Sequence, residues 1–547
     1  MLQPTLERPA AQPSAAVPAA AAATRPVRRL PRSWPYLVPA LVLAVVYGRT
    51  VQPGTGNAFS LDTTKFELVG RVLGTPHPPG YPLYTMLNAL VVRLVPVGSP
   101  ALLANLLSAV FALLTCVVAV SVLRSLGLSR VLAAGGATAL GMLPALWRNA
   151  VVAEVYSLSA LFLMAVLACV LRYERSRRPG WLRAALLLFA LSFAHAPTSV
   201  LLVPGLLLHL LARRPAWLVR PRELVTLLPA GALLALVPYA YLPWRTAVGG
   251  NTWLETRVSD AHSLWAALTG AQFGNRMFQV PLPTIWSERL PELAAAALGE
   301  LGPLLLLAAV GLVALALGRP AVAALMVGWV LATAAFVLSY AVDDWLTLLL
   351  PLWLLVALWA LVGLDRCLDR LCAPWPRRAR AVAAAASVAL VLVAFVHGLP
   401  QADRSGPDPQ QQVDAAVTQL PDSSIVFTGS LEARQQFAYR LLPDDLGLRR
   451  SIWAAEGPVR TADPGQSIHH LRSYCAADPG PWTWPWHEQP ASAILPRGLQ
   501  TFVYGADYAE EVRRQGLAVT PVADQLFAVD CPSSPRPRDG DLRAAPR

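Results

Sequence analysis

The chain has 547 residues, of which 55% are hydrophobic and 14% charged, and its mean hydropathy is +0.47. Soluble globular proteins carry about 25% charged residues, so this composition excludes a wholly soluble protein and indicates a polytopic membrane protein. The net charge of +12 comes mostly from arginines in short turns between apolar runs. That placement is typical of membrane orientation, and no nucleic-acid partner is expected because no basic, aromatic-interleaved groove is present.

The chain begins with a segment rich in Ala and Pro that contains an arginine cluster, residues 1–33. We predict a disordered cytoplasmic tail here, because no small-residue cleavage site follows the next apolar run, as a signal peptide would require. Heavy use of Ala, Arg and Pro, with a single lysine in the whole chain, indicates a GC-rich bacterium. The expected location is therefore the bacterial cytoplasmic membrane.

Apolar runs of spanning or near-spanning length follow the tail. They cover residues 34–50, 100–123, 130–147, 157–171, 181–197, 198–212, 224–243, 301–318, 320–340, 345–364 and 381–399. A further run, 81–97, is ambiguous because it contains Pro82, Asn88, Arg93 and Pro96. Whether this run crosses the membrane sets the orientation of everything after it.

Basic turns decide that orientation. The strongest are 172–183, 213–222 and 366–380. If successive spans alternate in direction, all three turns lie on the same side of the membrane as the N-terminal arginines only when 81–97 does not cross it. The positive-inside rule makes that side cytoplasmic. We therefore predict an all-α polytopic membrane protein with about 11 transmembrane helices and an interfacial helix at 81–97. Its N-terminus is cytoplasmic and its C-terminal part extracytoplasmic.

The predicted transmembrane domain covers 34–399 and presents two longer external loops, 51–80 and 244–300. Residues 400–531 are expected to form a small extracytoplasmic α/β domain, because short β-type runs alternate there with helical pieces. The β-type runs are 424–429, 501–505 and 526–530. The end of the chain, 532–547, is predicted to be disordered. Transmembrane and external parts are thus expected in one chain.

Cysteine usage is consistent with an external C-terminal domain. Cys475 and Cys531 lie in it and can pair if it faces an oxidising compartment. Cys367 and Cys372 fall in an arginine-rich turn, at a spacing too wide for a CxxC redox pair and without further zinc ligands. The sequence therefore leaves the pairing of Cys475 with Cys531 open.

The stretch 62–84 is the strongest candidate for chemistry. Asp62, just outside the first span, can act as a general base toward a hydroxyl, although it can equally be a helix N-cap. Lys65 is the only lysine of the chain. In a helix it would lie at i+3 from Asp62 and could bridge to it, or it could meet an anionic group of a substrate, while Glu67 could bridge to Arg71.

The histidine of the same stretch lies in the sequence TPHPPGYP. Prolines stiffen this loop, so His77 can be held rigidly enough to bind a phosphate or a sugar, or it can be a buried histidine satisfied by backbone. Tyr81 is grouped with it as a substrate-binding candidate. No metal site is predicted, because one histidine does not make one and no HxxxH or HExxH spacing exists.

Further candidates lie at the predicted outer ends of later spans. Glu154 and Tyr156 stand at the start of the run 157–171, where a carboxylate can also simply favour the helix dipole. Arg148 and Arg245 run against the positive-inside trend, and a guanidinium at that depth suits a phosphate. The alternative for the arginines is pairing with lipid headgroups or with acidic side chains of the chain itself.

A known family resembles these segments in this order. DTTKF is followed by LGTPHPPGYPLYTMLNAL, NLLSAVFALL, WRNAVVAEVYSLSALFL, FAHAPTSVLLVPG and PYAYLPWRTA. Together they resemble the bacterial members of a protein O-mannosyltransferase-like membrane family, once known as a domain of unknown function. The resemblance covers roughly residues 35–365, and the combination of HPPGYPLY with AEVYSL at this spacing is specific.

That family is placed in the GT-C glycosyltransferase superfamily, whose members use polyprenyl-phosphate sugars as donors. The resemblance implies that Asp62 is the carboxylate of the first external loop, that His77 is the HPPGYP histidine and that Glu154 is the AEVY glutamate. Many members read Asp-x-Gly-Glu at the first site, whereas this chain has Thr64 and Lys65 at the last two positions. One carboxylate then stands where two are common, which puts a divalent metal in doubt.

The function predicted from these observations is a membrane glycosyltransferase. It would move mannose or a similar hexose from a polyprenyl-phosphate donor to a hydroxyl of a protein or glycan acceptor, with inversion, on the extracytoplasmic side. Asp62 would be catalytic. The donor- and substrate-binding set is Lys65, His77, Tyr81, Arg148, Glu154, Tyr156 and Arg245, with no resident cofactor. The alternatives are a transporter or flippase of lipid-linked sugars, which internal repeats would favour, and a non-catalytic envelope scaffold.

Overall fold

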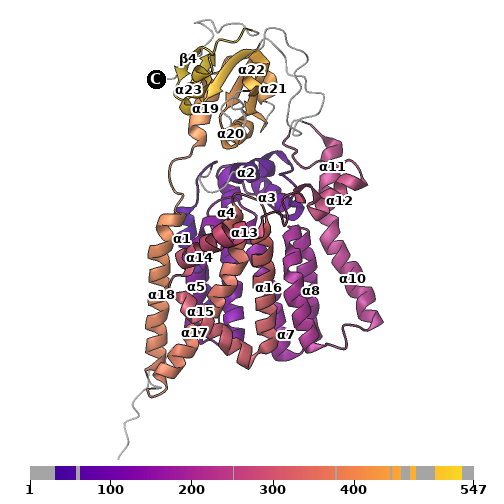
Figure 1. Cartoon of the computed structure of the whole chain (residues 1–547), viewed down its shortest axis with the longest axis vertical. Helices are drawn as coiled ribbons and strands as arrows, with labels where there is room; N and C mark the ends of the chain where they lie inside the picture. Colours follow the sequence, from indigo (N-terminus) through magenta and orange to yellow (C-terminus); the bar gives the residue numbers. More distant parts are fainter. Residues whose placement is uncertain are drawn as a thin grey trace, which may run out of the picture. The chain divides into compact units, whose positions relative to one another are not determined.

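The computed structural model describes residues 31, 33–56, 62–250, 252–375, 378–443, 446–456, 469–475 and 499–532. The two predicted disordered tails lie almost wholly outside these residues. Pro35–Arg547 forms one compact unit. It contains a bundle of long helices, a layer of short helices at one end of the bundle, and a small sheet with its own helices (Figure 1).

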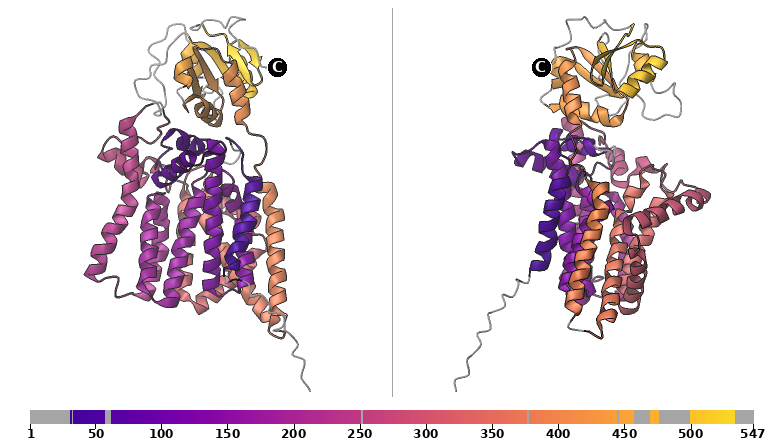
Figure 2. Two further views of the ribbon diagram at one scale, coloured as in Figure 1. Left: turned by 180° about the vertical axis from the view of Figure 1, so that it is seen from behind. Right: turned by 90° about the vertical axis from the view of Figure 1, so that its left-hand side faces the viewer.

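Each predicted apolar run is helical in the described part of the chain, although the run 130–147 is broken between Gly141 and Pro144. This confirms the all-α membrane architecture. The long helices run alongside one another in both views of Figure 2. Their bounds are α1 (Trp34–Thr50), α4 (Pro100–Leu126), α5 (Arg130–Gly141), α7 (Tyr156–Ser176), α8 (Pro179–Phe193), α9 (Val203–Arg213), α10 (Pro221–Leu236), α15 (Leu304–Gly318), α16 (Pro320–Ser339), α17 (Leu350–Cys372) and α18 (Ala379–Ala402).

Length and hydropathy separate these helices into two groups. Among the described residues, six helical segments are long and apolar enough to cross a membrane, and a seventh qualifies if the bent pair around α15 is one span. The shorter apolar helices include 179–193 and 197–213. The chain is thus a multi-pass membrane protein, while the count of 11 spans stays a prediction.

Short helices connect the long ones and gather at one end of the bundle. They are α2 (Thr63–Val72), α3 (Pro82–Leu94), α6 (Pro144–Ala150), η1 (Pro197–Leu202), η2 (Val237–Ala240), α11 (Tyr241–Val248), α12 (Ala261–Thr269), η3 (Ala271–Phe273), α13 (Leu282–Thr284), η4 (Ile285–Arg289), α14 (Leu290–Leu301) and η5 (Trp345–Leu349). The predicted interfacial helix is α3, which begins at a proline and ends before Pro96. With 13 residues it spans about 20 Å, too little for a hydrocarbon core of about 30 Å.

Close backbone approach holds part of the bundle together. A Cβ atom on Gly311 of α15 would lie 1.8 Å from the carbonyl oxygen of Trp359 in α17, and one on Gly363 would lie 1.9 Å from that of Leu307. Only glycine fits at such contacts, and small residues are what allow membrane helices to pack this closely. The pair α15–α17 is therefore a rigid part of the scaffold.

The C-terminal part contains a five-stranded sheet of order β2-β1-β3-β5-β4. The strands are β1 (Ser424–Thr428), β2 (Ile452–Glu456), β3 (Gln500–Tyr504), β4 (Val519–Ala523) and β5 (Leu526–Val529). β2, β1 and β3 are parallel, whereas β5 runs antiparallel to both of its neighbours. The helices around it are α19 (Gln410–Gln419), α20 (Leu431–Leu441), α21 (Leu446–Arg450), α22 (His469–Cys475) and α23 (Ala506–Arg514). This confirms the predicted α/β unit.

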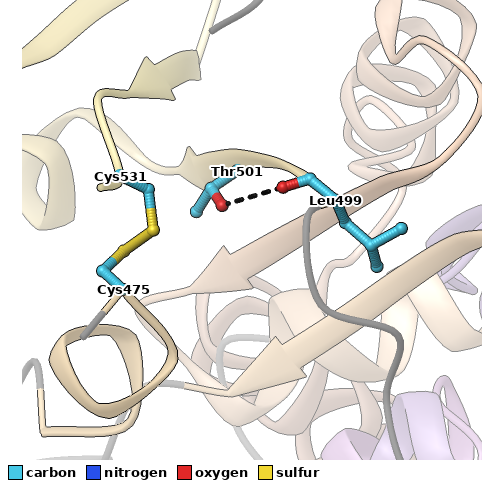
Figure 3. The surroundings of a disulfide bond; sticks show 4 residues. All are labelled: Cys475, Leu499, Thr501 and Cys531. Atoms are coloured by element: carbon cyan, nitrogen blue, oxygen red, sulfur yellow. Dashed lines mark hydrogen bonds between the residues drawn. A yellow bond between two sulfur atoms is a disulfide. The ribbon is translucent and has the colours of Figure 1, made fainter. Parts of the chain in front are cut away.

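Both faces of that sheet are covered. Ile425 and Phe427 belong to one apolar core and Val426 to another, as expected for a strand buried on both sides. A disulfide joins Cys475 at the end of α22 to Cys531 after β5, with Thr501 of β3 nearby (Figure 3). The cysteine pairing that the sequence left open is present in the structure.

Candidate active site

Asp62 occupies the N-cap position of α2, as one of the two sequence interpretations proposed. Its side chain, however, accepts no capping hydrogen bond from the helix. One carboxylate oxygen instead lies 2.7 Å from the ammonium nitrogen of Lys65, one turn along α2. The carboxylate is about one-third exposed, while the lysine side chain is only 5% exposed. Asp62 is thus oriented by a buried cation and remains reachable from outside.

Lys65 is surrounded by three acceptors. Besides Asp62, its Nζ atom donates to Glu255 Oε2 at 3.2 Å and lies 3.1 Å from His77 Nδ1. An ammonium group has three N–H bonds, so these three partners use them all. Burying a charged lysine is costly unless it is paired in this way. The predicted bridge from Asp62 to Lys65 is present, and two further segments of the chain converge on the same atom.

The contact with Lys65 fixes the tautomer of His77. An ammonium can only donate, so Nδ1 must be the acceptor and the imidazole proton must sit on Nε2. Asp62 Oδ2 lies 3.6 Å from Nδ1, too far to compete. The Nε2 atom lies 3.4 Å from the hydroxyl of Tyr81, and the two rings meet edge to face. His77 is therefore a neutral link between Lys65 and Tyr81.

Glu255, which sequence analysis did not select, is the second carboxylate of the cluster. It lies in the predicted external loop 244–300, and its other oxygen accepts a hydrogen bond from Trp253 Nε1 at 3.0 Å. Glu67 does not take this place. It lies two residues from Lys65, about 200° around α2, where it is fully buried and its pKa is raised by burial. Glu255 is close to Asp62 in space but far from it in sequence, so no local sequence pattern marks it as part of the site.

A short strand-like pairing brings the two loops together. The backbone N–H of Thr75 donates to Trp253 O at 2.7 Å, and that of Glu255 donates to Thr75 O at 3.0 Å. The Thr75 hydroxyl donates to Thr256 O at 2.8 Å. Gly80 continues this close approach with a φ of +84°, where a Cβ atom would lie 2.8 Å from Leu242. These contacts bring the side chains of His77 and Glu255 to the same cation, the Lys65 ammonium.

Glu154 joins the site from a different direction. It is 2% exposed, and the hydroxyl of Thr63, the residue after Asp62, donates to its Oε1 at 3.1 Å. Its backbone N–H is bonded to Ser108 of α4. Two residues further on, Tyr156 begins α7 and lines a mainly apolar cavity. The other lining side chains come from α7, η1, α16 and α17 and include Phe162, Leu163, Leu202, Phe336 and Leu350.

Both predicted arginines contact other parts of the protein. Arg245 is buried, and its guanidinium donates to the carbonyls of Leu73 at 2.6 Å and Gly249 at 3.2 Å. Arg148 pairs with Glu300 at 2.7 Å. These contacts favour a structural role for both: Arg245 fixes the end of α2, and Arg148 ties α6 to α14. The predicted bridge from Glu67 to Arg71 is wrong, because the Arg71 guanidinium donates to Tyr439 O instead.

Electrostatics follow from these contacts. Burial raises the pKa of Asp62, but the charge of Lys65 and its hydrogen bond to the carboxylate outweigh burial and hold that pKa well below its usual range. Burial lowers the pKa of Lys65, yet Asp62 and Glu255 outweigh it and keep the ammonium charged. The pKa of His77 is lowered, first by burial. Burial, and then the charges of Asp62 and Glu154, raise the pKa of Tyr81. An ionised Asp62 beside a charged lysine and a neutral histidine results.

Two comparisons of sequence identify relatives. Residues 62–218 match the family model described as the Protein O-mannosyl-transferase TMEM260 N-terminal domain. The Protein O-mannosyl-transferase TMEM260 of Mus musculus is 33% identical over 204 residues, which is 35% of this chain and 28% of that protein. The alignment thus spans little more than a quarter of the relative's length. The family match begins at Asp62 and includes Tyr156, whereas Arg245 and Glu255 lie beyond it.

Comparison of structures extends the likeness to nearly the whole chain. ArnT from Cupriavidus metallidurans bound to undecaprenyl phosphate has a TM-score of 0.55 at 15% identity, over 90% of this chain and 97% of that one. Its apo state has a TM-score of 0.54 at 14% identity, over 91% and 97%. The chain therefore has the architecture of a GT-C-type glycosyltransferase, as predicted. In sequence it is similar to a protein O-mannosyl-transferase, which confirms the resemblance noted from its motifs.

Proposed function

We propose that this protein is a membrane glycosyltransferase that moves mannose or a similar hexose from a polyprenyl-phosphate donor to an acceptor hydroxyl. The acceptor is a protein or glycan on the extracytoplasmic side of a bacterial cytoplasmic membrane. The GT-C architecture and the O-mannosyltransferase match support the class of reaction. The finer assignment of donor and acceptor rests on the shape and charge of the candidate site.

One observation carries the proposal: Thr63, Glu154 and Tyr156 link the polar cluster to the apolar cavity. Asp62 is followed by Thr63, Thr63 is bonded to Glu154, and Tyr156 two residues later lines the cavity. A polyprenyl-phosphate sugar has the same two-part character, with a charged head and an apolar tail. Its tail fits beside Tyr156 while its phosphate and sugar lie beside Asp62 and Lys65. Glu154 can then orient a sugar hydroxyl at the junction.

The proposed reaction is a single displacement with inversion. The acceptor oxygen attacks the anomeric carbon of the sugar, and the bond from that carbon to the phosphate oxygen breaks. The electron pair of the broken bond leaves with the polyprenyl phosphate. Asp62 accepts the hydrogen bond of the acceptor hydroxyl and takes its proton as the new bond forms. Because its pKa is held low, Asp62 mainly orients the hydroxyl early and receives the proton late.

Lys65 then offsets the charge that develops on the leaving phosphate. All three of its N–H bonds are occupied in the structure, so a phosphate oxygen must replace one acceptor. The neutral Nδ1 atom of His77 is the weakest of the three, since the other two acceptors are charged carboxylates. We expect the phosphate to displace His77 from Lys65, after which His77 Nε2–H and Tyr81 remain to bind the donor.

The test is a transfer assay with purified full-length protein, polyprenyl-phosphate mannose or glucose, and acceptor peptides or glycans. Asp62→Asn keeps the size of the side chain but removes its charge, and we expect turnover to fall by at least about a hundredfold. Asp507→Asn is the matched control, because Asp507 is exposed in α23. Full turnover in folded Asp62→Asn protein would refute the assignment of Asp62 as the base.

The same assay separates transfer from transport. A flippase of lipid-linked sugars would move the intact donor across a vesicle membrane without releasing free polyprenyl phosphate. We expect the sugar to appear on the acceptor in equal amount to the polyprenyl phosphate released. Movement of intact donor with no cleavage, by protein whose folding is verified, would favour the transporter alternative instead.

A further inference from the structure

The cluster around Lys65 has the composition of a cation site. Aspartate, glutamate and histidine side chains are usual protein ligands of divalent transition metals, and the carboxylates also bind Mg²⁺. Here one of each, from Asp62, Glu255 and His77, is directed at a single atom. That atom is the ammonium nitrogen of the only lysine in the chain. Three side chains from separate segments thus form a cation site, and the cation in it is the Lys65 side chain.

We propose that the Lys65 ammonium takes the place of a divalent cation in this site, so that Asp62, His77 and Glu255 hold a built-in positive charge and the protein needs no bound metal there. The acceptors lie 2.7–3.2 Å from Nζ. Metal bonds of 2.0–2.2 Å would require them to move inward by about 0.5 to 1.2 Å. Within the described residues no three ligand groups already stand at metal-binding spacing, which fits a site built around an ammonium.

Charge and burial support this assignment. Two carboxylates and a neutral imidazole leave a net charge of −2 without the lysine and −1 with it. Lys65 is 4% exposed, and removal of its charge would take a buried cation away from two carboxylates. A divalent cation would replace that positive charge. Truncating Lys65 should therefore uncover a metal site that the lysine side chain fills in the natural protein.

The consequence for catalysis rests on the proposed function. A cation that bridges two carboxylates and accepts a phosphate oxygen at its third position is the arrangement by which a metal ion binds a phosphate. Lys65 would do the same when the donor displaces His77. Metal binding itself can be measured without donor or acceptor, so a failure of this inference can be told apart from a failure of the transferase assignment.

The experiment uses the full chain, treated with a chelator and then titrated with Mn²⁺ alone. Binding is followed by electron paramagnetic resonance and by the thermal unfolding midpoint. We expect Lys65→Ala to bind one Mn²⁺ at least about tenfold more tightly than the natural protein, with a midpoint raised by the metal. Lys65→Met fills the same space without charge and should bind no more Mn²⁺ than the natural protein. Adding Glu255→Gln to Lys65→Ala should abolish the gain.

Two outcomes would overturn the proposal. One is Mn²⁺ binding by the natural protein that Glu255→Gln weakens, because the site would then hold metal beside the lysine. The other is Mn²⁺ affinity in Lys65→Ala equal to that in the double variant. If Lys65→Ala does not fold alone, purification in the presence of Mn²⁺ decides: recovery of folded protein by Mn²⁺ supports the proposal, and no recovery contradicts it.

Discussion

The contacts of Lys65 depend partly on local sequence and partly on tertiary structure. Its pairing with Asp62 follows from the i, i+3 spacing on a helix and could be predicted. Its contact with Glu255 depends on the pairing of Thr75 with Trp253 and Glu255, between two loops far apart in sequence. No periodic pattern encodes such a pairing. The predicted bridge from Glu67 to Arg71 failed for a related reason, because a backbone carbonyl from α20 took the guanidinium.

Because Lys65 is the only lysine, its chemical reactivity reports directly on the cluster. In the natural protein we expect its amine to react slowly with an amine-specific ester, since it is buried and its three N–H bonds are used. Glu255→Gln removes one charge partner and should speed the modification by about tenfold. Peptide mapping by mass spectrometry measures the rate, with the N-terminal amine as internal reference. Equal rates in both proteins would contradict the predicted cluster.

His77 should make stability depend on pH. Its pKa is lowered in the folded protein, mainly by burial, from an unfolded value near 6.5. The unfolded state therefore binds more protons just below that pH, and stability is lost as the pH falls through about 6.5 toward the folded pKa. We expect the unfolding midpoint to drop by a few degrees between about pH 7.5 and 5.5, and His77→Gln to reduce that drop. Asp62 acts in a separate, more acidic window, because its pKa is also lowered.

The control for that experiment is His262→Gln, since His262 is exposed in α12. Its midpoint should follow the natural protein at every pH. If His77→Gln and His262→Gln gave the same slope as the natural protein, burial of a neutral His77 would be excluded as a source of the pH dependence.

At the scale of elements, the position of α2 determines where Asp62 and Lys65 point. The Asn88 amide of α3 donates to Phe66 O at 2.7 Å, and Arg93 donates to Gly70 O at 3.0 Å. A Cβ atom on Gly70 would lie 2.3 Å from Asn88 Oδ1. The two helices therefore touch at Gly70, where α2 has no side chain. A larger residue at this position must push α2 and α3 apart.

Gly70→Ala should accordingly reduce transfer activity by about tenfold and lower stability by about 1–3 kcal/mol through overpacking. Gly48→Ala in α1 is the matched control, because a Cβ atom there has no neighbour within 4 Å. Activity and thermal unfolding of both variants are measured side by side. Unchanged activity in Gly70→Ala would show that α2 can shift without disturbing the site.

Elements with a strong apolar pattern could be predicted, and those without one could not. Each apolar run became helical, because apolar length is the main requirement of a membrane helix. In the sheet, the runs that gave β1, β3 and β5 were recognised. β4 was missed because it is a partly exposed edge strand that contains Pro521, and proline weakens a strand pattern. β2 was missed because IWAAE is short and equally compatible with a helix.

At the scale of the whole molecule, the C-terminal part contacts the helical layer through Tyr439 of α20. Its hydroxyl accepts a hydrogen bond from Ala101 N at 3.1 Å, and its carbonyl accepts one from Arg71 at 3.0 Å. The Arg71 guanidinium also lies 4.6 Å from the centre of its ring. α2 is thus held from both sides, by α3 and by α20. The C-terminal part therefore supports the candidate site through α2.

Cysteine chemistry can test the predicted orientation of the membrane protein. Cys475 and Cys531 are joined in the C-terminal part, whereas Cys367 and Cys372 at the end of α17 are free thiols. Disulfides persist outside the cytoplasm, so we predict that the pair lies on the extracytoplasmic side. The positive-inside rule predicts that the basic turn 366–380 lies on the cytoplasmic side. The two pairs of cysteines should therefore face opposite compartments.

In intact cells, a membrane-impermeant maleimide should label neither pair before reduction. After an impermeant reductant it should label Cys475 and Cys531, because the disulfide opens on the accessible side. Cys367 and Cys372 should react only once the membrane is permeabilised, and mass spectrometry of the peptides distinguishes the sites. Labelling of Cys367 in intact cells would reverse the orientation and place Asp62 in the cytoplasm. A donor and acceptor outside the cell could then not meet at the cluster, so the proposed extracytoplasmic transfer would be excluded.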